Sequence, residues 1–181
     1  MYYKSIIEGT IRVDPSRFSE KLKTVILEEL KENYQNKVIE DLGRVLIVNS
    51  IKKVGDGMIV PGDGAAFYNV EFEAIHYLPE LNELIEGEIK DIANFGAFVD
   101  FGAFEGMIHI SQTMDDFVSF SKDGTLLGKE SKRVLKVGDK VRSRIIAISL
   151  KNAFDPKIGM TMRQPYLGKI DYIEEMRKLE K

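Results

Sequence analysis

Glycines recur within an apolar run from Glu86 to Ser111, and this pattern constrains the fold more than any other part of the chain. The apolar residues are Ile89, Ile92, Phe95, Phe98 and Phe101, and the glycines are Gly87, Gly96, Gly102 and Gly106. Glycine within a strand marks a bulge, a bend or a close approach of another backbone. Short strands with repeated bends are what a small closed barrel needs. We therefore predict barrel strands at 84–92, 95–101, 105–110, 140–150 and 158–162.

The spacing G-x-I-x-x-I-x-x-F-G-A-F-V, followed by G-M-I-H-I-S, resembles the OB-fold RNA-binding domain of the ribosomal protein S-one type, over residues 83–163. Single-stranded RNA is bound by flat π-surfaces for the bases and positive charge for the phosphates. The resemblance implies that Phe95, Phe98 and His109 lie on or near the RNA-binding face. It also implies that phosphates meet basic residues on and after the later strands, here Arg142, Arg144 and Lys151.

The same residues have a structural interpretation that the sequence leaves open. A phenylalanine in a small barrel is often part of the core, and a lone histidine such as His109 is often a hydrogen-bonded structural residue. The stretch Lys129–Arg163 holds ten basic and three acidic residues. It is either a phosphate footprint or an ordinary solvated surface.

Residues 1–81 are predicted to form a separate α+β domain ahead of the barrel domain, residues 82–181. Asp14 and Pro15 are suited to open a helix that ends between Tyr34 and Asn36. Pro79 cannot donate to a strand ladder, which suits a domain boundary there. The order is β-α-β-β, an RNP-like unit with the helix on one sheet face. Its strands are expected at Tyr2–Val13, Arg44–Val54 and Ala66–Leu78.

A glycine-rich segment from Gly55 to Ala65 is predicted to be a loop between the last two strands of this domain. Its centre, Met58-Ile59-Val60, is apolar. An apolar loop tip either folds back on its own domain or docks into a partner.

The segment Gln112–Val137 is a long insertion between the third and fourth barrel strands. It is expected to hold a short strand at Phe117–Phe120 and a turn at Lys122-Asp123-Gly124. Whether it covers part of the RNA face is left open. The tail, Tyr166–Lys181, is expected to form a short amphipathic helix.

Catalytic, metal and cofactor sites find no support in the sequence. The chain has no cysteine, which excludes disulfides, cysteine zinc sites and thiol nucleophiles. Asp56 and Asp63 are interpreted as turn formers rather than metal ligands. Asp115 and Asp116 are adjacent, and neighbours on a strand point to opposite faces rather than forming a dyad. Because no signal peptide or membrane span is apparent, we expect a cytoplasmic protein without membrane contact.

The whole chain resembles the family of the E-prime subunit of archaeal RNA polymerase, the counterpart of the seventh subunit of eukaryotic RNA polymerase II. The segments that carry the resemblance are Pro61–Ile75, Ser111–Phe117, Gly128–Arg142 and Lys157–Lys169. It implies a non-catalytic stalk component of a nucleotidyltransferase complex. It also implies pairing with a smaller helical polymerase partner, the F subunit of archaea, and a barrel that contacts emerging single-stranded RNA.

In this family the loop of the N-terminal domain docks on the core polymerase near the base of the clamp, and the protein supports promoter opening and elongation. The docking residues implied here are Gly55, Gly57, Met58, Ile59, Val60, Pro61, Gly62 and Gly64. The alternative is a translation or RNA-decay accessory factor that uses the same barrel. A nuclease or metal-dependent enzyme is a third hypothesis, which the missing catalytic constellations disfavour.

Overall fold

The computed structural model describes residues 1–121 and 123–179, and the chain divides into two compact units, Met1–Leu78 and Pro79–Lys181. The sequence places this boundary after residue 81. In the part of the chain that is described, no helix is both long and apolar enough to cross a bilayer.

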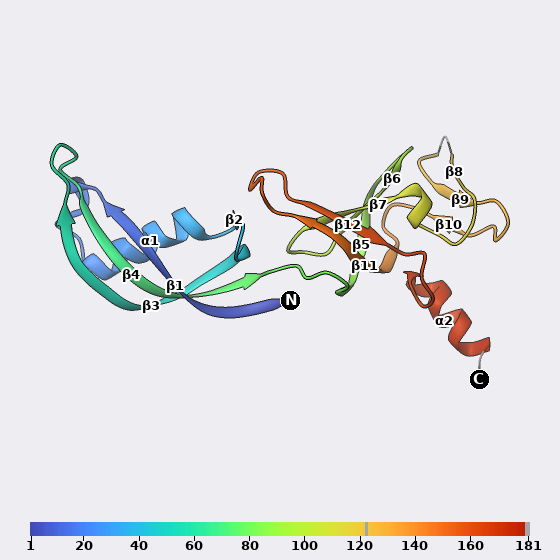
Figure 1. The fold of residues 1–181 in the computed structure, drawn as a ribbon, viewed down its shortest axis with the longest axis horizontal. Helices are drawn as coiled ribbons and strands as arrows, with labels where there is room; N and C mark the ends of the chain where they lie inside the picture. Colours follow the sequence, from blue (N-terminus) through green and yellow to red (C-terminus); the bar gives the residue numbers. More distant parts are fainter. Residues whose placement is uncertain (122, 180–181) are drawn as a thin grey trace. The chain divides into compact units, whose positions relative to one another are not determined.

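The first unit is an antiparallel sheet with one long helix on one face (Figure 1). The strand order is β1-β4-β3-β2, and α1 contacts β1 and β3. The predicted α+β class is confirmed, and β2 is a short strand that the sequence did not indicate. The bounds are β1 Tyr2–Val13, α1 Leu22–Tyr34, β2 Val38–Ile39, β3 Gly43–Ile59 and β4 Ala66–Tyr77.

Strand β3 turns its apolar side chains to the helix at every third residue rather than every second. Its core residues are Val45, Val48, Ile51 and Val54, and they pack against the buried face of α1 around Phe72. A strand normally alternates with a period of two. At each of four register shifts against β4, β3 has one extra residue. The extra residue turns the next apolar side chain back toward the helix.

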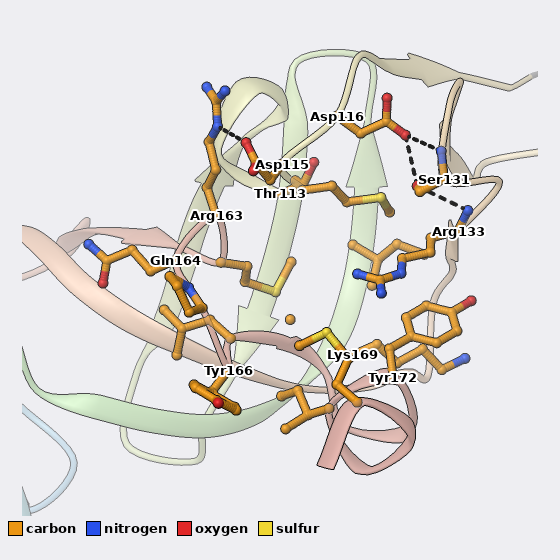
Figure 2. A pocket seen from close by; sticks show the side chains of 18 of the residues that line it. Thr113, Asp115, Asp116, Ser131, Arg133, Arg163, Gln164, Tyr166, Lys169 and Tyr172 are labelled. Carbon is orange, nitrogen blue, oxygen red and sulfur yellow. Dashed lines mark hydrogen bonds and ion pairs between the residues drawn. The ribbon is translucent and has the colours of Figure 1, made fainter. Parts of the chain in front are cut away.

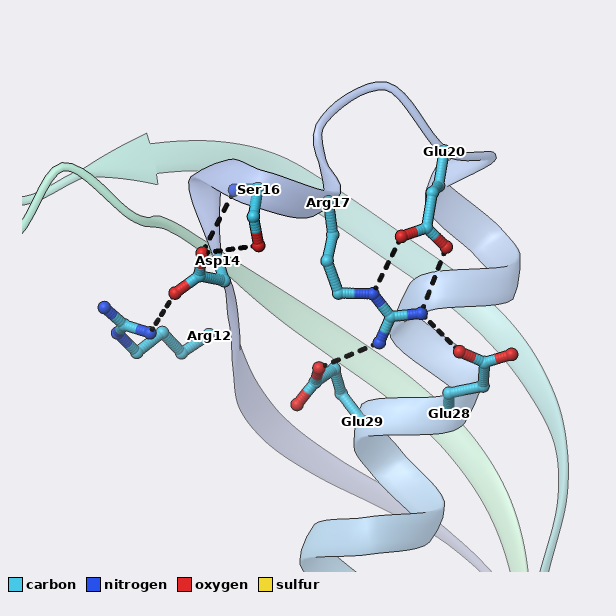
Figure 3. Close-up of polar contacts among 7 residues, drawn as sticks. All are labelled: Arg12, Asp14, Ser16, Arg17, Glu20, Glu28 and Glu29. Atoms are coloured by element: carbon cyan, nitrogen blue, oxygen red, sulfur yellow. Dashed lines mark hydrogen bonds and ion pairs between the residues drawn. The ribbon is translucent and has the colours of Figure 1, made fainter.

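The helix begins later than predicted. Asp14 caps a 3-10 turn, η1 (Pro15–Arg17), and accepts hydrogen bonds from the amide and hydroxyl of Ser16 at 3.0 and 2.8 Å (Figure 3). The α-helix starts only at Leu22. Arg17 joins the turn to α1 through ion pairs with Glu28 and Glu29, and it also pairs with Glu20 in the segment between them. Asp14 and Pro15 therefore do open a helical segment, but it is the 3-10 turn and not α1.

The second unit is a five-stranded closed barrel, as predicted. The sheet order is β12-β7-β6-β5-β11-β13, and a further pairing of β12 with β11 closes it. Strands β12 and β7 are parallel, and the other neighbours are antiparallel. The five barrel strands are β5 Leu84–Ala93, β6 Gly96–Asp100, β7 Glu105–His109, β11 Lys140–Ser149 and β12 Lys157–Thr161. A sixth strand, β13 Gly168–Lys169, pairs with β11. The buried side chains that fill it include Ile89, Val99, Ile108, Ile145 and Met160.

At three glycines of the barrel, a neighbouring strand approaches too closely for a larger residue. A Cβ on Gly87 would lie 2.5 Å from the carbonyl oxygen of Asp100, and one on Gly96 would overlap that of Ile108. At Gly106 the added atom would meet the Met160 sulfur. Gly102 instead has a φ of +85°, which favours glycine for backbone reasons. The predicted role of glycine in this segment is confirmed.

The insertion forms a small sheet of its own, with the order β10-β9-β8. The sequence predicted only one strand here. The bounds are β8 Val118–Phe120, β9 Leu126–Gly128 and β10 Val134–Leu135. The turn predicted at 122–124 includes Lys122, which lies outside the described residues. The C-terminal helix α2 (Ile170–Leu179) is present, and its Tyr172 hydroxyl donates to the carbonyl of Val134 at 3.4 Å.

Candidate nucleic-acid interface

The structure brings Phe95, Phe98 and His109 together on the outside of the barrel. The inward positions of β6 are Ala97 and Val99, so Phe98 points outward. Phe95 lies in the turn before β6, 48% exposed, and its ring centre is 6.0 Å from that of Phe98, edge to face. His109 faces Gly96 across the β6–β7 ladder. The three rings therefore line one surface that bases can reach, and the insertion does not bury Phe95.

His109 also has a local structural role. Its Nδ1 accepts hydrogen bonds from the hydroxyl and the amide of Ser111, at 2.8 and 3.3 Å. These bonds cap the 3-10 turn η2 (Ile110–Gln112). With Nδ1 as the acceptor, Nε2 carries the ring proton in neutral imidazole. The exposed ring thus presents a donor edge beside the phenylalanines, and the two interpretations of His109 are compatible.

The predicted phosphate-binding residues do not join this aromatic surface. Arg142 and Arg144 lie on β11, which is separated from β6 by β5. Arg142 donates to Glu86 at 2.6 Å, which neutralises its charge locally. The Arg144 Nε is buried with no hydrogen-bond partner among the described residues. Lys151 is exposed in the loop that follows β11.

A register shift in β11 also changes its second half. The sequence alternation places Ala147 and Ser149 on the same side as Val141, Ser143 and Ile145. The shift between Ile145 and Ala147 reverses the alternation, and both Ala147 and Ser149 are outside the core. Strict alternation was wrong here because a bulge adds one residue.

Met107 is a neighbour of the aromatic surface that the sequence reasoning missed. It is opposite Phe98 in the β6–β7 register and 37% exposed. The alternation in G-M-I-H-I already places Met107 on the same face as His109. On the other side of Phe98, β5 contributes Asp91. Lys90 is bound to Glu105 at 2.7 Å. The surface is therefore aromatic and apolar, with its nearby charges acidic or paired.

The predicted tip loop is shorter than expected, because β3 continues into it. Gly57, Met58 and Ile59 pair with Tyr68, Phe67 and Ala66 of β4, and Gly55 is also within β3. The turn itself spans residues 60–65, which include Pro61, and Gly62 and Gly64 have φ values of +96° and +71°. Most of the predicted loop is therefore the end of the β3–β4 hairpin.

The apolar residues of the tip are exposed rather than folded back on their own unit. The exposed fractions are 55% for Met58, 67% for Ile59 and 47% for Val60. Arg12 holds the turn from β1 by donating to both carboxylate oxygens of Asp63, at 2.6 and 3.0 Å. The same contact lowers the pKa of Asp63. The tip is thus an ordered apolar projection.

The remaining titratable candidates are engaged structurally. His76 is buried, with its ring nitrogens 2.6 Å from the Leu42 carbonyl and 3.0 Å from the Ser5 hydroxyl. Asp115 accepts from Arg163 at 3.0 Å. Asp116 accepts from the amides of Ser131 and Glu130, which lowers its pKa to about 2. Within residues 1–121 and 123–179, no group of three or more histidines and carboxylates could hold a metal ion.

Comparison with known protein families matches both units. Residues 8–64 match the model described as "SHS2 domain found in N terminus of Rpb7p/Rpc25p/MJ0397". Residues 78–153 match the model of the S1 RNA binding domain. These matches follow the order of the α+β unit and the barrel.

Two similar proteins match nearly the whole chain, and a third matches about two thirds of it. The chain is 41% identical over 180 residues to DNA-directed RNA polymerase subunit Rpo7 of Saccharolobus shibatae, covering 98% of this chain and 100% of that protein. For the protein of the same name from Sulfolobus acidocaldarius, identity is 40% over 176 residues, 96% of each chain. DNA-directed RNA polymerase III subunit rpc8 of Schizosaccharomyces pombe is 31% identical over 123 residues, 68% of this chain and 61% of that protein.

Proposed function

The chain belongs to the family of DNA-directed RNA polymerase subunit Rpo7, and from this premise we propose that it is a non-catalytic stalk component that binds emerging RNA. The observation that carries the RNA-binding part is the exposed surface of Phe95, Phe98 and His109 on a domain that matches the S1 model. In this role the protein supports promoter opening and elongation without chemistry of its own.

The hairpin end at Met58, Ile59 and Val60 docks on the core polymerase. Three exposed apolar side chains on an ordered projection are suited to fill an apolar recess, since their burial is favourable and little ordering is needed. Arg12 and the left-handed glycines keep the turn in one conformation. The second partner is the smaller helical polymerase protein, and this pairing is proposed from the family resemblance alone.

RNA binds by stacking its bases on Phe95 and Phe98, with the Nε2 edge of His109 donating to a base or a phosphate. Each stacked base contributes about 1–3 kcal/mol by truncation. Because a stacking surface accepts every base, sequence preference is slight. Arg142 contributes less than an unpaired arginine would, since Glu86 already binds it.

Substitution of the exposed phenylalanine tests the RNA surface. Phe95→Ala should weaken binding of single-stranded RNA roughly 5- to 150-fold, the equivalent of one lost stacking contact. The matched control is Phe154→Ala, because Phe154 is 99% exposed in the β11–β12 loop and away from the aromatic surface. Fluorescence anisotropy at fixed salt measures both. Equal affinities for the two variants would refute the surface.

Charge on the tip tests polymerase docking. Ile59→Asp should abolish recovery of the large polymerase subunits in a tagged pull-down from native extract treated with nuclease, while leaving RNA affinity unchanged. Val137→Asp is the control, since Val137 is 53% exposed on the other unit. Recovery of ribosomes or a decay complex in place of polymerase would favour the alternative, an accessory factor in translation or RNA decay.

A further inference from the structure

A cavity of about 400 Å³ lies in the second unit, between the insertion, the segment after β12 and helix α2 (Figure 2). Its walls come from residues 113–116, 131–135 and 162–169 and from the first turns of α2. Small-molecule pockets typically have roughly 300–1,000 Å³. The cavity is therefore large enough for a nucleotide-sized group, and no role assigned above uses it.

Arg133 supplies an unneutralised positive charge to this cavity. The central carbon of its guanidinium lies 5.3 Å from the centre of the Tyr172 ring. Figure 2 shows the Arg133 side chain extending toward the cavity beside this ring. Lys169 is 5.6 Å from the same ring, but Asp139 binds it at 2.8 Å. Among the described residues, no carboxylate forms an ion pair with Arg133. A charge of this kind is available to an anionic ligand.

The groups that hold Arg133 in place are themselves ordered. Tyr172 accepts from the Val134 amide at 3.3 Å, which fixes the ring beneath the guanidinium. Asp116 accepts from the Ser131 amide and hydroxyl at 2.9 and 2.7 Å, which fixes the turn that precedes Arg133. Little ordering is left to be done on binding, which favours affinity.

The cavity lining mixes polar groups with flexible apolar side chains. The apolar side chains include Met114, Met162, Ile173 and Met176. Methionine is flexible and polarizable, and its sulfur makes favourable contacts with aromatic rings. Apolar side chains near an arginine suit a ligand with a flat ring and an anionic group, which is the chemistry of a nucleotide.

A second hollow adjoins the cavity and is lined in part by Ser111. That hollow is also lined by Phe117 and shares Asp115, Asp116 and Arg163 with the cavity. Ser111 is the residue that hydrogen-bonds His109. The charges near the aromatic surface are acidic or paired, whereas Arg133 has no ion-pair partner among the described residues.

We propose that this cavity is a second RNA subsite, in which Arg133 binds a phosphate and a base enters the methionine-lined interior. One strand then runs from Phe95 and His109 over Ser111 into the cavity. The proposal rests on the RNA-binding function proposed above and extends it by one subsite. A short oligonucleotide fills the aromatic surface alone, and a longer one reaches both.

Binding of oligouridylates of 5 and 15 nucleotides to the full chain tests the subsite by fluorescence anisotropy. Arg133→Ala should weaken the 15-mer roughly 3- to 10-fold and lower its salt slope by about one, as expected for a lost phosphate contact. The 5-mer should be unchanged. Lys136→Ala is the matched control, because it removes one exposed charge from the same segment without lining the cavity. It should change neither length.

Phe95→Ala separates failure of the subsite from failure of the proposed RNA surface, since it should weaken both lengths. If Phe95→Ala weakens both and Arg133→Ala matches Lys136→Ala on the 15-mer, the subsite is wrong and the surface stands. If Phe95→Ala changes neither length, the surface is wrong. If Arg133→Ala spares RNA but weakens polymerase recovery, the cavity takes a protein segment and the proposal is overturned.

Discussion

The two units bury their sheet surfaces in different ways. The N-terminal sheet has a 17-residue strand, β3, that curves through four register shifts and is covered by a helix on one face only. Its other face keeps Ile6 63% and Ile47 49% exposed. The barrel uses strands of five to ten residues and closes on itself, so its core side chains face inward.

This difference indicates which kind of partner each unit is suited to bind. A one-sided sheet leaves some exposed apolar side chains on its open face and an apolar hairpin end, which suit protein partners. A closed barrel leaves only outward side chains, and here the distinctive ones are aromatic. In the proposed function, the unit curved by bulges docks on protein and the closed barrel stacks bases.

The largest expected effect comes from emptying the helix-covered core. Phe72 is fully buried and its ring centre lies 4.9 Å from that of Tyr34. Phe72→Ala should destabilise the N-terminal unit by about 3–5 kcal/mol, since it leaves a cavity. Hydrogen exchange resolved by segment should show the loss in β1, β3 and β4 and preserved protection in the barrel.

The control for this variant lies on the same strand. Phe67 points to the open face and is only partly buried, so Phe67→Ala should cost clearly less than Phe72→Ala. Equal loss of protection in both units after Phe72→Ala would contradict their independence, and the comparison between them would then fail.

A smaller effect should come from the glycines that let the barrel close. Gly96→Ala places a Cβ against the Ile108 carbonyl oxygen, a backbone atom that cannot move without shifting β7. Overpacking of this kind costs about 1–3 kcal/mol. Gly62→Ala meets no atom within 4 Å and carries only left-handed backbone strain, with a φ of +96°. Its cost is roughly 1 kcal/mol. Denaturant unfolding followed by circular dichroism would rank the two, and the reverse order would refute steric closure.

Much of the fold was predictable because its signals are local. The glycines at 87, 96 and 106 indicated close approaches, and the five barrel strands begin and end within one residue of the predicted bounds. The bulges of β3 were not predicted, although Val45, Val48, Ile51 and Val54 recur at intervals of three. A period of three belongs to neither a regular strand nor a helix, so only pairing with β4 gives it meaning.

The candidate site was predictable only in part, for a topological reason. Phe95, Phe98 and His109 lie close in sequence and on adjacent strands, so the motif locates them together. Arg142 and Arg144 come from β11, and their distance from β6 depends on the order in which the barrel closes. Arg133 was visible only as part of a charged stretch, because its place beside Tyr172 depends on two segments meeting in space.

The smallest expected effect concerns the charged centre of the open sheet face. Contacts with Lys52, Asn49 and Lys4 lower the pKa of Glu73 from 4.5 to about 2. Because the pKa of Glu73 is lower in the folded state, its charged contacts contribute their full stability when the pH is above 4.5, the ordinary pKa. That contribution is lost as the pH falls from 4.5 towards 2. Glu73→Gln should therefore reduce stability of the N-terminal unit at neutral pH and flatten its decline between about pH 5 and 2, as followed by hydrogen exchange of β4.

Glu71→Gln is the matched control, on the same strand and face. Glu71 contacts one lysine, Lys53, at 3.4 Å, whereas Glu73 contacts two lysines and an amide. The control should keep the acid-dependent decline of the native chain. If both variants decline alike, the acid sensitivity of this unit does not arise at Glu73. The barrel has no equivalent carboxylate held by two lysines among its described residues, so its protection should respond to neither substitution.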